Sequence, residues 1–295
     1  MSEAWDDRRT WSLRLSQALD DIGVTRRMVD RRRRTWLRRE ALQKLLSLFL
    51  GSGMTMYNFG SQSEGTTTLG MHSDIDILFS QNDAAVLLDL SEWQQGKDNL
   101  LVVNTERSPP QHCNLQRLGR DRRLPNKDVE DPYEVVDNDG KVLLTTKITE
   151  IFLLSERKLI FYGPSRSLNK NVDMVQAFPC ARLPAECQFL FERPRPGHWP
   201  TKDMLAQASA YPVFLVPAGY PDSPYHEKLL EWRFSTSLME RLLIFSFNTT
   251  QLKVFVLLKI IRKAFIKIVV GDNFSTFHMK TAMMFTIESY PPDIW

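Results

Sequence analysis

The sequence has little of what marks several common protein classes. Its 295 residues include three cysteines, Cys113, Cys180 and Cys187, and so odd and scattered a set does not suggest a disulfide framework. The N-terminus is charged from Glu3 onward and has no apolar segment of the kind found in secretory signals. The most apolar stretch, residues 252–270, carries five basic residues, too many for a bilayer span. We therefore expect a cytoplasmic protein without a membrane segment.

Neither sign of charge dominates the composition. Lys and Arg number 38 against 35 Asp and Glu, so the overall balance does not identify a partner. Hydrophobic residues make up 43% and charged residues 25%, as in folded soluble proteins, and the length allows one large domain or two lobes. There is no internal repeat and no low-complexity tail. Any sign of function must therefore come from local patterns.

Basic residues concentrate in one segment near the N-terminus. Residues 26–39 contain eight arginines and one acidic residue, Asp30, and an apolar stretch follows up to Phe49. The spacing predicts one helix that ends at Gly51-Ser52-Gly53. On such a helix four arginines share one face, and we call them the arginine stripe: Arg27, Arg31, Arg34 and Arg38. The stripe suits contact with nucleic-acid phosphates, and the alternative is an ordinary solvated helix face.

Strand patterns surround a polar turn in the next segment. Residues 54–59 and 74–79 are predicted strands, joined by the polar turn 60–70, and a further strand over 172–178 is expected to stop at Pro179. Asn138-Asp139-Gly140 predicts a hairpin turn.

The character of the sequence changes after Trp199-Pro200. Residues 227–247, 251–270 and 275–289 show helical apolar spacing. We therefore expect a mainly helical C-terminal lobe.

Three acidic residues suggest metal-dependent chemistry. Asp74 and Asp76 are two residues apart in a predicted strand and so share a face, and Asp173 lies in a strand that could pair beside it. Such carboxylates, together with substrate phosphates, are typical magnesium ligands. Gly60-Ser61 precedes the pair and could offer backbone N–H groups to phosphate oxygens. The alternatives are a solvated strand edge and an ordinary hairpin turn.

These residues resemble a known family, and the resemblance extends from about residue 20 to the end. The strings that carry it are Gly60-Ser61-Gln62-Ser63-Glu64-Gly65, Ser73-Asp74-Ile75-Asp76-Ile77-Leu78 and Val172-Asp173-Met174-Val175, then Glu231-Trp232-Arg233-Phe234-Ser235, Leu257-Leu258-Lys259 and Phe277-His278-Met279-Lys280-Thr281-Ala282. In this order they are similar to the cyclic GMP-AMP synthase family, and most of all to its invertebrate Mab-21-type receptors.

The resemblance implies an α+β, bilobal nucleotidyltransferase fold with a mixed β-sheet core. Residues 1–53 would form the N-terminal basic spine helices, 54–205 the nucleotidyltransferase core, and 206–295 the helical C-terminal lobe. Members of the family usually continue through more helices, so a truncated lobe is one interpretation of the end at Trp295.

The resemblance also assigns site residues. Asp74, Asp76 and Asp173 would be the catalytic, metal-binding triad for Mg²⁺ or Mn²⁺. The residues implied in nucleotide binding are Gly60, Ser61, Arg233, Ser235, Lys259 and Phe277, with the Phe277 ring stacking on a base. Arg233 could instead pair with Glu231 or Glu240, and Phe277 could be a core residue.

The implied activity is synthesis of a cyclic dinucleotide from ATP and GTP in innate immune sensing. Residues 247–251 join two predicted helices directly where cyclic GMP-AMP synthase has a zinc insertion, so no structural zinc is expected. The activating ligand would therefore be double-stranded nucleic acid, with RNA favoured over DNA. Two alternatives stay open: a catalytically silent scaffold of the same fold that binds nucleotide or a protein partner, and an enzyme that makes linear oligonucleotides.

Overall fold

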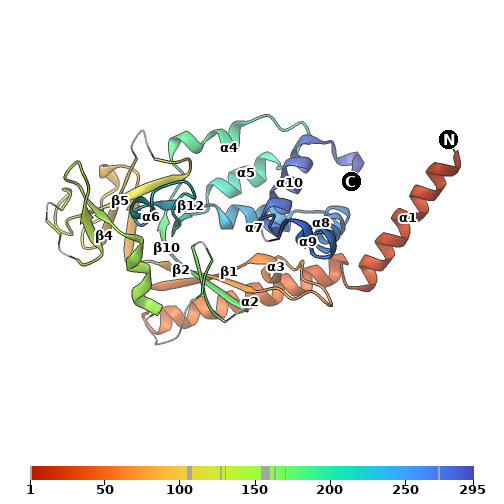
Figure 1. The fold of residues 1–295 in the computed structure, drawn as a ribbon, viewed down its shortest axis with the longest axis horizontal. Coiled ribbons are helices and arrows are strands. Elements are labelled where there is room, and N and C mark those ends of the chain that lie inside the picture. Colours follow the sequence, from red (N-terminus) through yellow and green to blue (C-terminus); the bar gives the residue numbers. More distant parts are fainter. Residues whose placement is uncertain are drawn as a thin grey trace.

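The protein is a mixed α+β structure built on a central sheet (Figure 1). The computed structural model describes residues 2–104, 108–126, 128–129, 131–153, 160–162, 164–169, 171–271 and 273–295. The sequence prediction of an α+β class with a mixed sheet is confirmed, because the sheet contains both parallel and antiparallel pairs. None of the described helices is long and apolar enough to cross a membrane.

The strands follow one another along most of the chain. Their bounds are β1 Met54–Phe59, β2 Ile75–Gln81, β3 Ala84–Leu87, β4 Asp98–Val103, β5 His112–Leu118, β6 Glu134–Val136, β7 Val142–Leu144, β8 Ile160–Tyr162, β9 Ser165–Asn169, β10 Val172–Cys180, β11 Val213–Pro217 and β12 Trp232–Ser235. The order across the sheet is β1-β2-β10-β11-β12-β5-β4-β3.

Strand β10 links two parts of this sheet. Its first residues lie between β2 and β9, and its last residues lie between β11 and β3. Because β3 also pairs with β4, the pairs β10-β11-β12-β5-β4-β3 close into a ring of strands. The expected hairpin turn at residues 138–140 is confirmed between β6 and β7.

The helices flank the sheet and gather at one end of it (Figure 1). The α-helices are α1 Ser2–Asp21, α2 Arg26–Phe49, α3 Gly60–Ser63, α4 Phe189–Glu192, α5 Lys202–Ser209, α6 Tyr225–Lys228, α7 Ser237–Phe245, α8 Thr249–Ile261, α9 Lys267–Val270 and α10 Thr276–Ser289. A π-helical turn, Arg262–Ile266, joins α8 to α9. Short 3₁₀ turns are η1 Leu90–Glu92, η2 Thr146–Leu153, η3 Ala185–Cys187 and η5 Pro292–Ile294.

Helix α2 has the predicted extent and runs along the lower edge of the molecule in Figure 1. Thr25 caps its N-terminus by accepting a hydrogen bond from the N–H of Met28. Helix α1 projects away from the rest of the chain.

Two strand boundaries and one helix differ from the sequence prediction. Helix was expected over 227–247, but β12 occupies Trp232–Ser235, because Trp232 and Phe234 alternate into the core with the period of a strand. Strand β10 does not stop at Pro179. Its pairing with β2 ends at Ala177, so the missing N–H of Pro179 removes no bond from that ladder.

The domain boundary predicted at residue 205 stays a prediction. Strands β11 and β12 both follow it, yet they pair with β10 and β5 of the sheet. The helical part of the C-terminal region therefore begins with α7.

Helix α7 connects the core of the sheet with the core of the helical end. On the sheet side, its Leu238 packs in a buried cluster with Leu78, Phe214 and Val216. On the other side, Ile244 packs with residues of α2, α8 and α10, namely Val29, Leu252, Met283 and Ile287. The sheet and the helical end are thereby held together through α7.

Candidate active site

The parallel pairing of β2 and β10 brings two of the three predicted carboxylates together. Asp173 is the register partner of Asp76, so both side chains project from the same face of the sheet at neighbouring positions. Both are half-buried. The Ser167 hydroxyl on β9 hydrogen-bonds Asp173 Oδ1. The expectation that the strand containing Asp173 pairs beside the strand containing Asp76 is confirmed.

The turn that begins at Gly60 lies directly over Asp76. Phe59 is the register partner of Asp76, so Gly60 follows at the point where β1 passes the carboxylate. Gly60 has φ +72°, and a Cβ at this position would lie 1.7 Å from Asp76 Oδ2. Only glycine fits here, because any side chain would collide with the carboxylate. The turn and the carboxylates thus form one site.

The same turn is fixed at its other end against α2. Gly65 has φ +74°, and a Cβ there would lie 2.8 Å from the carbonyl oxygen of Val29. The guanidinium of Arg33, a buried residue of α2, donates to the carbonyl of Glu64 at 2.9 Å and to the carbonyls of Phe245 and Ile244 at 3.0 and 3.1 Å. One arginine of the spine helix therefore ties the turn to the C-terminal end of α7.

The electrostatics at Asp76 reflect the crowding of negative charge. Burial, with Asp173, Asp74 and Glu64 as further causes, raises the pKa of Asp76 from 3.8 to about 7, while Lys280 acts in the opposite direction. The pKa of Asp74 is also raised, by burial and by Asp173. A cation bound between the carboxylates would relieve this repulsion.

Asp74 is less well placed than the sequence predicted. It precedes β2 instead of lying within it, and its side chain is exposed. No group of three or more His, Cys, Asp or Glu side chains among the described residues is arranged to hold a metal ion. A pair of carboxylates, Asp76 and Asp173, is what the fold brings together, and the part of Asp74 stays a prediction.

Lys259 reaches the turn from helix α8. It is 8% exposed, and its ammonium donates to the Ser61 hydroxyl at 2.7 Å and to the Thr66 hydroxyl at 3.2 Å. Burial lowers its pKa to about 8, with Glu64 acting in the opposite direction and Lys280 reinforcing the decrease. The predicted neighbourhood of Lys259 and Ser61 is therefore present, and the ammonium contacts hydroxyl groups that a phosphate could replace as partners.

A buried ion-pair network behind the turn was not predicted. Lys280 on α10 pairs with Glu64 at 2.9 Å and with Glu240 on α7 at 3.4 Å. Burial opposes the charge of Lys280, but the two carboxylates outweigh it and raise its pKa. The signal available in the sequence was a single lysine within the apolar run Met279-Lys280-Thr281-Ala282-Met283, which requires an acidic partner if that helix face is buried.

Arg233 and Ser235 lie on β12 and project from the same face as the carboxylates. Their register partners, Val216 and Phe214, pack against Leu78 of β2, two residues after Asp76. Arg233 is half-buried, and burial lowers its pKa, with Glu240 acting in the opposite direction. The Ser235 hydroxyl lies 2.7 Å from that of Ser237.

The alternative partners considered for Arg233 are engaged elsewhere. Glu231 accepts hydrogen bonds from the N–H of Tyr220 and the Ser223 hydroxyl, and Glu240 pairs with Lys280. No ion pair of Arg233 occurs within the described ranges, so its guanidinium is available to an anion.

Phe277 lies on α10, one turn before Lys280. It is 55% exposed, and its ring meets that of His278 edge-on at 6.2 Å. Residues three apart share a helix face, so Phe277 lies on the side of α10 that faces the turn. The alternative of a core residue is wrong, because the ring is exposed.

The arginine stripe is fully on the outside of α2. All four of its side chains are exposed, whereas Arg33 beside them is 4% exposed. A groove of about 360 Å³ runs along this helix between Arg26, Arg34 and Phe245. The apolar residues at the end of α2, such as Leu42 and Leu45, are also exposed, at 67% and 63%.

Comparison with known proteins gives no family assignment. No protein-family model matches the chain, and no similar curated protein is found.

Proposed function

We propose that this protein is a nucleotidyltransferase of the cyclic GMP-AMP synthase-like, Mab-21-type family, with the bilobal fold of that family. It would join ATP and GTP into a cyclic dinucleotide in the cytoplasm when double-stranded RNA binds. The observation that carries the proposal is the register pairing of Asp76 with Asp173 directly beneath the Gly60–Ser61 turn.

The donor set at this pair suits a hard divalent cation. Asp76 and Asp173 offer carboxylate oxygens from adjacent strands, and the mutual repulsion that raises the Asp76 pKa is the condition that a cation would relieve. When bound there, Mg²⁺ or Mn²⁺ would supply charge neutralisation for the reacting phosphates. Asp74 would complete the set from the start of β2.

The remaining residues would hold the nucleotide. The Ser61 hydroxyl, the N–H groups of the turn and the Lys259 ammonium converge where a triphosphate would lie. Arg233 and Ser235 would contact phosphate or base edges from the same sheet face, and the exposed Phe277 ring would stack on a base. Asp173 is our candidate for accepting the proton of the attacking ribose hydroxyl.

The partner that activates the enzyme is inferred from α2. The arginine stripe faces solvent, while Arg33 on the same helix contacts the turn. Double-stranded RNA on the stripe would therefore lie one helix width from the site.

The test is a synthesis assay with purified protein. The protein is incubated with labelled ATP and GTP, Mg²⁺, and either duplex RNA or duplex DNA. We expect a product that forms with RNA and survives phosphatase, because a ring has no terminal phosphate. A phosphatase-sensitive product would mean linear oligonucleotide synthesis instead, and no product with any ligand would leave the silent scaffold as the better account.

Asp173→Asn is the informative variant in this assay, with Asp222→Asn as its control. Asp222 is exposed and distant in sequence from every candidate site residue. We expect synthesis to be lost in Asp173→Asn and kept in Asp222→Asn.

A further inference from the structure

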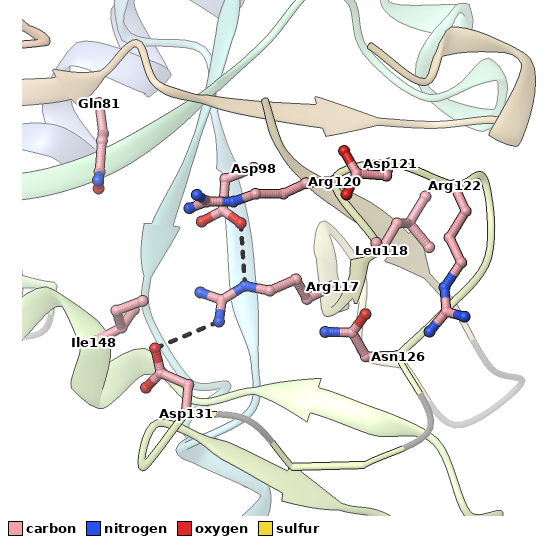
Figure 2. Close-up of a pocket in the computed structure, with 11 residues that line it drawn as sticks. Gln81, Asp98, Arg117, Leu118, Arg120, Asp121, Arg122, Asn126, Asp131 and Ile148 are labelled. Atoms are coloured by element: carbon pink, nitrogen blue, oxygen red, sulfur yellow. Dashed lines mark hydrogen bonds and ion pairs between the residues drawn. The ribbon is translucent and has the colours of Figure 1, made fainter. Parts of the chain in front are cut away.

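A second polar cavity lies at the opposite end of β2 from the carboxylates. It has a volume of about 840 Å³ and is lined from β2 by Gln81, five residues beyond Asp76. The other lining residues come from β4, β5, the loop after β5 and η2, and Figure 2 shows them around a central arginine, Arg117. The volume is in the range that binds small molecules.

The floor of this cavity is built and rigid. Arg117 pairs with Glu134 at 2.7 Å, with Asp98 at 3.3 Å and with Asp131 at 3.4 Å. The side chain of Glu134 is fully buried and that of Arg117 is 13% exposed. One guanidinium thus serves three carboxylates, which leaves oxygens of Asp98 and Asp131 able to accept hydrogen bonds from a ligand.

The rim is a basic loop held in place by its backbone. The Gly119 N–H donates to the carbonyl of Leu124 at 2.9 Å, and the Gly119 carbonyl accepts from the indole of Trp93 at 3.0 Å. The loop presents Arg120 and Arg122 at the cavity (Figure 2). Within the described part of the chain, neither guanidinium has a carboxylate within ion-pair distance. Two unpaired arginines on a fixed loop are suited to a phosphate group.

A buried amide points into the same space. Asn126 is 7% exposed, and its side chain turns toward the cavity in Figure 2. Among the residues that the structure describes, its amide has no hydrogen-bond partner. A buried polar side chain without a partner is uncommon unless a ligand or water completes it.

From these features we infer a binding site for a phosphorylated, hydroxyl-bearing small molecule, in which Arg120 and Arg122 hold the phosphate while Asn126 and the floor carboxylates Asp98 and Asp131 bind its hydroxyl groups. This site is separate from the proposed active site, and the inference does not depend on the proposed function.

Calorimetric titration with ribose 5-phosphate, AMP, inorganic phosphate and adenosine tests the inference. We expect binding of the two phosphorylated ribosides and none of adenosine. Arg120→Gln/Arg122→Gln should weaken binding by about tenfold or more. Arg8→Gln/Arg9→Gln removes the same charge from exposed positions on α1 and should change nothing.

Two further measurements locate the ligand. Ribose 5-phosphate should protect Arg120 and Arg122, but not Arg8 and Arg9, from labelling by phenylglyoxal, as read by mass spectrometry. Lys259→Ala, which alters only the candidate active site, should leave this binding intact.

Three results would overturn the inference. They are absence of binding at millimolar concentration, equal binding by the Arg120→Gln/Arg122→Gln variant, and binding that Lys259→Ala abolishes. Variants with unchanged unfolding temperature are the ones compared.

Discussion

Replacing Asp76 with asparagine should stabilise the protein above pH 7 when no divalent cation is present. The unfolded chain ionises this carboxylate above about pH 4, whereas the folded chain keeps it protonated up to about pH 7. Ionised Asp76 therefore costs folding free energy, and this cost grows from pH 4 to pH 7 and is constant above. Asparagine has no charge and removes the cost.

The magnitude follows from the raised pKa. The change from 3.8 to about 7 corresponds to at most about 4 kcal/mol at 1.36 kcal/mol per pH unit. Because the side chain is half-buried and water can reach it, we expect about 1–3 kcal/mol. Most substitutions destabilise, so a gain of this size at one residue would mark a position kept for function at the expense of stability.

Urea denaturation at several pH values, with and without Mg²⁺, is the assay. The variant should exceed the wild type above pH 7 in chelator, and the two should converge near pH 4. Mg²⁺ should stabilise the wild type and close the gap, while the variant responds less. Asp222→Asn, at an exposed position, should follow the wild type throughout.

The reasoning is refuted if Asp76→Asn is less stable than the wild type above pH 7. It is also refuted if Mg²⁺ stabilises both proteins equally, because the carboxylate would then have no part in cation binding.

Other perturbations test the neighbouring residues. Affinity for a nucleoside triphosphate should fall as the pH rises through about 8, where Lys259 loses its proton, and Lys259→Arg should shift that fall to higher pH in calorimetric titrations. Lys280→Gln leaves Glu64 and Glu240 without their cation and should cost about 3–5 kcal/mol in urea denaturation; Lys280→Arg should recover part of this, and full stability of the Gln variant would contradict the pairing. Glutamine at all four positions of the arginine stripe should weaken duplex RNA binding and flatten its salt dependence by about one log unit per lost phosphate contact, whereas an unchanged slope would place RNA elsewhere.

Local patterns predicted the elements that position the candidate site. Helix α2, strands β1 and β2 and the glycine turn each follow from periodicity or turn residues within a few positions. The pairing of Asp76 with Asp173 was predicted because each lies in a short run with strand character. The resemblance in the sequence added the neighbourhood of Lys259 and Ser61, which lie 198 residues apart.

The remaining features depend on contacts that sequence spacing does not contain. Strand β12 was taken for helix because its four residues lie within a longer apolar segment, and its period of two is too short to stand out. The pairing of Lys280 with Glu64 joins residues 216 positions apart. The cavity around Arg117 likewise arises only when β2, β4, β5 and η2 meet.

The most direct test of the central claim is a crystal structure of the protein with Mg²⁺ and a non-hydrolysable ATP analogue. We predict a cation bonded to carboxylate oxygens of Asp76 and Asp173, with the triphosphate against Ser61 and Lys259. A nucleotide bound elsewhere, or Asp76 and Asp173 without a cation in the presence of bound nucleotide, would contradict the account.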